Sequence, residues 1–184
     1  MSANSITPWN ILESKKGPDL KLFSSRFDSV ENPRNGMRME AVVIESQDWV
    51  NVVALTPGKK IILVKQYRFG TGKVSLEVPA GIVDPGETPV ETARRELLEE
   101  TGFTVSNIRL IGECYPQPAV LSNRCFFYLA EDAVKTRQQK LDAGEDIEIL
   151  TVPLKEIQAK IESNEIDHGM VLLAFFFFRI KKGL

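Results

Sequence analysis

Three glutamates, Glu96, Glu99 and Glu100, lie close together near the end of an expected helix, where carboxylates are costly. At about 100° per residue, Glu96 and Glu100 share one edge of that helix, and Glu99 is beside them. Like charges at i and i+4 destabilise a helix by about 0.2–0.5 kcal/mol. The negative end of the helix dipole adds about 0.3–1 kcal/mol for each nearby carboxylate. A hard divalent cation held by carboxylate oxygens would reverse the sign of these energies, so the cluster predicts a metal site.

The alternative interpretation of the cluster is a solvated acidic helix face. Two neighbouring features favour the metal site. The glycine-rich turn at residues 81–86 precedes the helix and can fold over it to present backbone carbonyls. Arg95 comes directly before the cluster and can orient a carboxylate such as Glu87.

The ends of this helix can be predicted from capping residues. Thr88 is a suitable N-cap, Pro89 suits the first helical position, and Glu91 completes a capping box. Gly102 is a natural stop at the C-terminal end. The apolar positions recur at helical spacing, which predicts one stripe that packs inward: Val90, Ala93 and Leu97.

The segment Gly81–Phe103 resembles the Nudix box, G-x5-E-x7-R-E-U-x-E-E-x-G-U, where U is a bulky apolar residue, and it matches every specified position. This resemblance implies a Nudix hydrolase that cleaves nucleoside diphosphates linked to another group, with Mg²⁺ or Mn²⁺ as cofactor. It implies that Arg95 orients carboxylates within the catalytic centre. The implied metal ligands are Glu96 and Glu100, the backbone carbonyl of Ala80, and Glu99 as a further ligand or water-orienting group.

Residues outside the box are similar to those of bacterial ADP-ribose pyrophosphatases. The segment Gly144–Glu148 resembles the mobile acidic loop that brings a catalytic glutamate to the pyrophosphate. Glu145 takes the position of that glutamate. Arg68 follows an expected strand. It matches the arginine that lies at the nucleotide in those enzymes, which also follows a strand. Pro118 follows the box at the spacing that distinguishes ADP-ribose hydrolases. The implied substrate-binding residues are Arg38, Arg68, Glu77 and Pro118, and the implied catalytic residues are Arg95, Glu99 and Glu145.

The resemblance predicts hydrolysis of ADP-ribose to AMP and ribose 5-phosphate, with either Glu145 or Glu99 accepting the proton from water. Two departures leave other substrates open: the loop at residues 119–124 lacks a glutamate near Asn123, and the strand at residues 40–45 lacks an arginine. The alternatives are a pyrophosphatase for GDP-mannose or another sugar nucleotide, and a non-catalytic sensor that binds ADP-ribose. The N-terminal extension and the Glu145 loop favour a sugar-nucleotide hydrolase over a hydrolase of damaged nucleoside triphosphates.

The elements that must position these residues form a mixed α/β pattern. Helices are expected near Leu154–Ser163 and in the C-terminal tail. The expected strands of the main sheet are Trp49–Leu55, Ile61–Gln66, Val74–Val78, Ile108–Cys114, Arg124–Ala130 and Asp146–Val152. This order predicts a mixed β-sheet sandwiched between helices, which is consistent with the Nudix fold.

Residues 1–48 differ from the main domain at residues 49–184. Turn-forming clusters at Lys16–Asp19 and Glu31–Gly36 separate expected strands at Leu20–Phe27 and Met37–Glu45. This segment has too little apolar surface to fold alone. By the resemblance it forms a small antiparallel sheet region that helps to build a homodimer.

Composition excludes several other classes of protein. The chain has 184 residues, 23 basic against 25 acidic, and no basic stretch that would indicate nucleic-acid binding. Cys114 and Cys125 lack metal-site spacing, and His168 is the sole histidine, which disfavours a Ser-His-Asp or Cys-His mechanism. The apolar run at residues 170–178 is too short to span a bilayer, and residues 1–17 are polar. We therefore expect a soluble, cytoplasmic enzyme with a small-molecule substrate and no membrane partner.

Overall fold

A computed structural model describes residues 6–183, and these residues form two compact units. The first unit contains the residues up to Gln47 together with Tyr115–Asn123. The second contains Asp48–Cys114 and the residues from Arg124 onwards. Residues 1–5 of the expected N-terminal segment, and Leu184, lie outside the described residues. The segment Tyr115–Asn123 had no signal in the sequence that would assign it to the first unit.

The second unit is built on a mixed sheet with the strand order β12-β5-β4-β10-β9, to which β6 is added at β5 and β7 at β4. Strands β4 and β10 are parallel, and the other pairs are antiparallel. The strands are β4 (Trp49–Leu55), β5 (Lys60–Arg68), β6 (Lys73–Glu77), β7 (Ala80–Ile82), β9 (Asn107–Cys114), β10 (Cys125–Glu131) and β12 (Ile147–Pro153). Two short strands, β8 (Phe103–Thr104) and β11 (Val134–Lys135), pair with each other.

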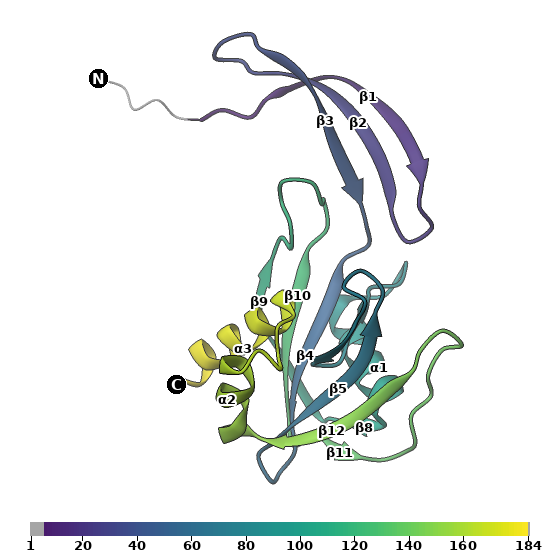
Figure 1. Ribbon diagram of the computed structural model, residues 1–184, viewed down its shortest axis with the longest axis vertical. Coiled ribbons are helices and arrows are strands. Elements are labelled where there is room, and N and C mark those ends of the chain that lie inside the picture. Colours follow the sequence, from purple (N-terminus) through teal and green to yellow (C-terminus); the bar gives the residue numbers. More distant parts are fainter. Residues whose placement is uncertain (1–5, 184) are drawn as a thin grey trace. The chain divides into compact units, whose positions relative to one another are not determined.

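Helices cover both faces of this sheet (Figure 1). Helix α1 (Pro89–Thr101) lies on one face, and α2 (Ile157–Glu162) and α3 (Gly169–Lys182) lie on the other, with a 3-10 turn η1 (Leu154–Glu156) before α2. Strand β4 is buried on both sides: Val52 packs in the core under α1, and Val53 packs in the core under α3. This explains why apolar residues fill the strand except at Asn51, rather than alternating with polar ones. The expected fold class is confirmed.

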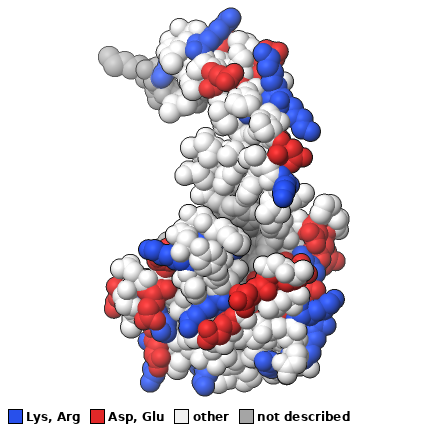
Figure 2. Space-filling view, turned by 45° about the vertical axis from the view of Figure 1, so that its right-hand side comes forward, with Lys and Arg blue, Asp and Glu red and all other residues white. Residues whose placement is uncertain are grey.

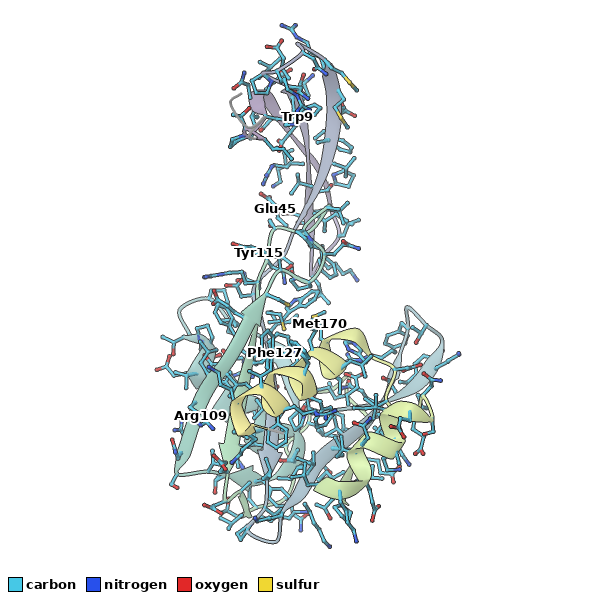
Figure 3. All side chains as sticks on the ribbon, turned by 90° about the vertical axis from the view of Figure 1, so that its left-hand side faces the viewer. Trp9, Glu45, Arg109, Tyr115, Phe127 and Met170 are labelled. Atoms are coloured by element: carbon cyan, nitrogen blue, oxygen red, sulfur yellow. The ribbon has the colours of Figure 1, made fainter. Side chains whose placement is uncertain are left out.

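The core under α3 joins aromatic side chains from the helix and the sheet. The rings of Phe127 on β10 and Phe177 on α3 lie 5.2 Å apart, and Figure 3 shows Phe127 beneath α3, with Met170 near the start of that helix. Gly112 on β9 has no side chain because an added Cβ would lie 2.5 Å from the Phe177 ring. The Phe175–Phe178 block is therefore largely a core element, although Phe176 is 56% exposed.

Helix α1 begins and ends where the capping residues predict. Thr88 and Glu91 form the full capping box, and Gly102 adopts a left-handed conformation with φ 74°. Ala93 and Leu97 are fully buried against the sheet, as expected. The expectation for Val90 was wrong, because this side chain in the first turn is 36% exposed.

The first unit contains an antiparallel sheet in the order β1-β2-β3, formed by β1 (Asn10–Asp19), β2 (Ser24–Glu31) and β3 (Arg38–Glu45). The expected strand at residues 37–45 is confirmed to within one residue. The expected turn at residues 16–19 is wrong, because those residues complete β1. Gly17 serves close strand packing there, since an added Cβ would lie 2.4 Å from Ser25 Oγ.

Acidic and basic side chains are interspersed over the face of the described residues that Figure 2 shows, without an extended basic area. Among residues 6–183, no helix is both long and apolar enough to cross a membrane.

Candidate functional site

The two carboxylates that share an edge of α1 are largely removed from water. Glu100 is 2% exposed, and its Oε2 accepts a hydrogen bond from the Ala80 backbone N–H at 3.2 Å. Within residues 6–183, no lysine or arginine forms an ion pair with Glu100. The Glu96 side chain is 12% exposed, and its Oε1 lies 2.8 Å from Arg95 Nη1. This burial rules out the alternative of a solvated acidic helix face.

Burial makes ionisation of both carboxyl groups costly. It raises the pKa of Glu96 to about 7, although the charge of Arg95 acts in the opposite direction. Burial, and then the charge of Glu96, raises the pKa of Glu100 well above its usual value. A pair of buried carboxyl groups that disfavour each other's ionisation is typical of a functional site, because it gives no benefit to folding.

Arg95 forms ion pairs with four carboxylates beside the buried glutamates. Its Nε and Nη2 form a bidentate pair with Glu87, at 3.0 Å to each oxygen. Its Nη1 donates to Glu96 Oε1 at 2.8 Å and to Glu99 Oε2 at 3.2 Å. Asp84 lies 3.5 Å from Nη2. The guanidinium thereby fixes the orientation of side chains from both the turn and the helix.

The glycine-rich turn lies directly against the acidic face of α1. An added Cβ at Gly81 would lie 2.1 Å from Glu96 Oε1, so only glycine lets β7 approach this carboxylate. The strand is held there by its pairing with β4, where Ala80 lies opposite Asn51 and Gly81 opposite Val50. The turn therefore places the Ala80 backbone beside Glu100.

Arg68 and Glu77 form a second buried charge pair at the ends of β5 and β6. Arg68 Nε and Nη2 donate to the two carboxylate oxygens of Glu77 at 2.8 and 2.6 Å. Burial alone would raise the pKa of Glu77, but the bonds and charge of Arg68 outweigh it and leave the pKa lowered. Glu77 is 1% exposed, whereas 40% of the Arg68 side chain is exposed. Arg68 is therefore the member of the pair that can reach a ligand, and Glu77 orients it.

The loop that carries Glu145 is anchored at the C-terminal end of α1. The Lys140 backbone N–H donates to Glu99 O at 2.9 Å, and Gln139 Nε2 donates to Glu100 O at 2.6 Å and to Ile147 O at 3.1 Å. The charge of Glu145 helps to raise the pKa of both Glu96 and Glu100, so its carboxylate lies within their electrostatic reach.

The other two expected substrate residues, Arg38 and Pro118, belong to the first unit. Arg38 Nε donates to Glu31 Oε2 at 2.6 Å on neighbouring strands. Pro118 lies in a turn in which Gln117 O accepts the backbone N–H groups of Val120 and Leu121.

Sequence reasoning missed two residues near the site. Gln139 ties the loop to α1 and β12, and no motif marked it. His168 precedes α3, and its charged form would favour ionised Glu77. The only signal for His168 was that it is the sole histidine of the chain.

The donor set fits a hard divalent cation. Glu96 and Glu100 supply carboxylate oxygens, which are the ligands that Mg²⁺ and Mn²⁺ prefer. Glu96 shares Arg95 with three other carboxylates, and Glu100 forms no ion pair within residues 6–183. Glu99 pairs with Arg95, and the described residues contain no ready-made cluster of three or more His, Cys, Asp or Glu side chains. The Glu96–Glu100 pair is thus the part of the site whose chemistry best fits a divalent cation.

Comparison with known proteins agrees with this fold. Residues 46–173 match the NUDIX domain. The ADP-ribose pyrophosphatase of Bacillus subtilis (strain 168) is 32% identical over 94% of this chain and 96% of its own length. A GDP-mannose pyrophosphatase of Citrobacter koseri (strain ATCC BAA-895 / CDC 4225-83 / SGSC4696) is 34% identical over 61% of this chain and 63% of its own. The crystal structure of an ADP compounds hydrolase shares the fold, with a TM-score of 0.87 at 24% identity and 98% coverage of both chains.

The fold and the acidic helix define a hydrolase that acts on pyrophosphate bonds. The chain belongs to the Nudix family.

Proposed function

We propose that this protein hydrolyses the pyrophosphate of ADP-ribose to AMP and ribose 5-phosphate. The observation that carries the proposal is the burial of Glu100 beside Glu96 without a basic ion-pair partner among the described residues. A divalent cation held by this pair would offset its charge and attract an anionic substrate. The similarity to the Bacillus subtilis ADP-ribose pyrophosphatase over nearly the whole chain supports ADP-ribose as that substrate.

We propose Mg²⁺ or Mn²⁺ as the cofactor. Glu96 and Glu100 would hold it, together with the carbonyl of Ala80 and with Glu99 where that side chain leaves Arg95. When bound, the cation would offset the charge of the pyrophosphate and lower the pKa of a bound water.

The protein groups have separate roles in this proposal. Glu145 accepts the proton from the attacking water, and Glu99 is the alternative proton acceptor. Arg95 keeps the carboxylates in position. Arg68 donates to the nucleotide through Nη1, because Nε and Nη2 already bind Glu77. Arg38 and Pro118 are also proposed as substrate-binding residues.

A substrate panel tests the proposed function. The purified protein with Mg²⁺ should convert ADP-ribose to AMP, detected by chromatography, faster than it converts any other nucleoside diphosphate sugar. A higher kcat/KM for GDP-mannose would instead assign the second candidate function, which the Citrobacter koseri relative favours. Tight ADP-ribose binding with no turnover on any substrate would identify a sensor and contradict the enzyme proposal.

Replacing Glu145 by glutamine should lower kcat by about 10²–10⁴-fold, the usual contribution of a general base. Binding of Mn²⁺, measured by calorimetry, should change little because Glu145 belongs to the loop and not to α1. Glu148→Gln is the matched control, since this exposed residue lies three positions further on and, among the described residues, forms an ion pair with Lys65 alone. If Glu145→Gln retained the wild-type kcat, Glu99 would take over as the proposed proton acceptor.

We also propose that the chain acts as a homodimer in the cytoplasm. The first unit exposes apolar side chains on its strands, among them Ile11 at 60%, Met39 at 47% and Val42 at 46%. A small sheet with so little buried apolar surface requires a partner surface. Cys114 and Cys125 are both free thiols, which suits a reducing compartment.

The dimer prediction concerns the row of Ile11, Val30 and Met39, which the strand register places side by side on one face of the first unit. The wild-type protein should have twice the 20.6 kDa mass of one chain in light scattering. Replacing Ile11 and Met39 by serine should shift it towards the monomer, because the contact loses apolar area. Glu40→Gln, next to Met39 but on the opposite face, should leave the mass unchanged. A monomeric wild-type protein would contradict the prediction.

A further inference from the structure

A cavity of about 670 Å³ lies between α2, α3 and the turn that joins β4 to β5. Figure 1 and Figure 3 both show α2 and α3 side by side on the same face of the sheet. The volume of the cavity is within the range of roughly 300–1,000 Å³ that is typical of small-molecule sites. The proposed function uses no residue of this cavity.

The cavity is apart from the site on α1. Strand β5 starts directly after the lining residue Lys59 and ends at Arg68, which belongs to the other site. At about 3.3 Å per residue, the two ends of this strand are roughly 25 Å apart. A ligand in the cavity would therefore not contact the substrate.

The walls of the cavity are apolar. Ile157 and Ile161 from α2 face Phe175 and Phe178 from α3. Ile157, Phe175 and Phe178 are at most 4% exposed, so they form a rigid part of the core rather than loose surface side chains. An apolar ligand body would gain free energy by covering the apolar lining that is still open to water, such as the partly exposed Ile161, at about 25 cal/mol per Å² removed from water.

The charges that line the cavity have one sign. Lys59, Lys155 and Arg179 line it, and none of the described lining residues is acidic. Within residues 6–183, these three cations form no ion pair. Arg179 Nη1 donates instead to Gln158 Oε1 at 3.0 Å. A ligand that carries an anionic head would therefore meet cations without carboxylate competitors.

We infer that this cavity binds a small amphipathic carboxylate, with an apolar body between α2 and α3 and its head at the three cations. The Arg179–Gln158 bond joins the two helical walls. This geometry suits a small molecule better than a helix laid along a groove. The site is independent of the proposed hydrolysis.

Calorimetric titration of the full chain with decanoate tests the inference. Decanoate should bind saturably at one site per chain, with a Kd below about 1 mM. Decylamine, which has the same chain length and the opposite charge, should bind at least about tenfold more weakly. Absence of saturable decanoate binding, or equal binding of decylamine, would overturn the inference.

Charge variants locate the binding site. The double variant Lys155→Gln with Arg179→Gln should weaken decanoate binding at least about tenfold. Both side chains are exposed, so folding should be retained, and circular dichroism checks this. Lys181→Gln is the matched control, because this exposed lysine is on α3 but does not line the cavity.

Two outcomes of the variant experiment would assign a different occupant. Unchanged decanoate binding by the double variant would place the ligand elsewhere, for example on the exposed apolar strands of the first unit. Loss of self-association in the double variant, with no decanoate binding by the wild type, would make the cavity a contact between two copies of the chain. Either result would overturn the inference.

Discussion

Glu100→Gln is expected to lower kcat/KM for pyrophosphate hydrolysis by at least about a thousandfold, the effect of losing about 4 kcal/mol of transition-state stabilisation. Glutamine has the size of glutamate and can still accept the Ala80 N–H bond, so the fold should be retained. It lacks the charge needed to hold a divalent cation beside Glu96. Initial rates at saturating Mg²⁺ measure the effect.

The same substitution should stabilise the metal-free protein above the usual carboxyl pKa, and more strongly as the pH rises. The pKa of Glu100 is raised in the folded state, so the folded protein binds more protons than the unfolded chain once the pH exceeds the usual carboxyl pKa of about 4.5. The stability of the wild type then falls as the pH rises, because ionising the buried pair is unfavourable. Glutamine removes this cost.

Thermal unfolding in EDTA at pH 5 and pH 8 provides the measurement. At pH 8 the Tm of Glu100→Gln should exceed the wild-type Tm by at least about 2 °C, the shift that about 1 kcal/mol gives in a protein of this size. At pH 5 the difference should be smaller, since more of the wild-type carboxyl is protonated. The exposed Glu156→Gln is the control and should change neither Tm nor turnover. A variant that was active, or that was less stable than the wild type at pH 8, would refute the assignment of Glu100.

The sequence predicted the main sheet and α1 well, because both have strong local signals. The capping box and Gly102 define α1 without reference to the rest of the chain. Strand β4 is an apolar run of buried residues whose predicted bounds are those of the structure. Strand β1 was missed because its residues are polar and exposed, and because two irregularities interrupt its pairing with β2.

The residues of the acidic helix were predictable, whereas their burial and their partners were not. The spacing of Glu96 and Glu100 places them on one edge of a helix. Only the packing of β7 on α1 shows that Glu100 is 2% exposed. Arg68 lies opposite Lys73, and Glu77 lies opposite Val64, so the bidentate contact runs diagonally across β5 and β6 and depends on their register. No local pattern encodes that register.

This contact leads to the second large prediction. Arg68→Gln should destabilise the protein by about 2–4 kcal/mol, because Glu77 would be left buried with its charge uncompensated. The cost should be in the lower part of that range, since 40% of the Arg68 side chain is exposed and its charge is partly screened. The double variant Arg68→Gln with Glu77→Gln should recover more than half of the loss, because two neutral amides can pair without a buried charge.

The pH dependence separates a lost charge pair from lost packing. In the wild type, the pKa of Glu77 is lowered, so its contribution to stability is present above the usual carboxyl pKa and is lost as the pH falls. Without Arg68, burial raises this pKa, and stability should instead fall as the pH rises from 5 to 8. Urea unfolding at both pH values measures the change. Arg109→Gln, which removes an exposed arginine 3.8 Å from Glu131, should cost less than about 0.5 kcal/mol. If Arg68→Gln cost no more than this control, then Glu77 could not depend on Arg68 for its charge, and the proposed role of the pair in orienting Arg68 towards the nucleotide would be wrong.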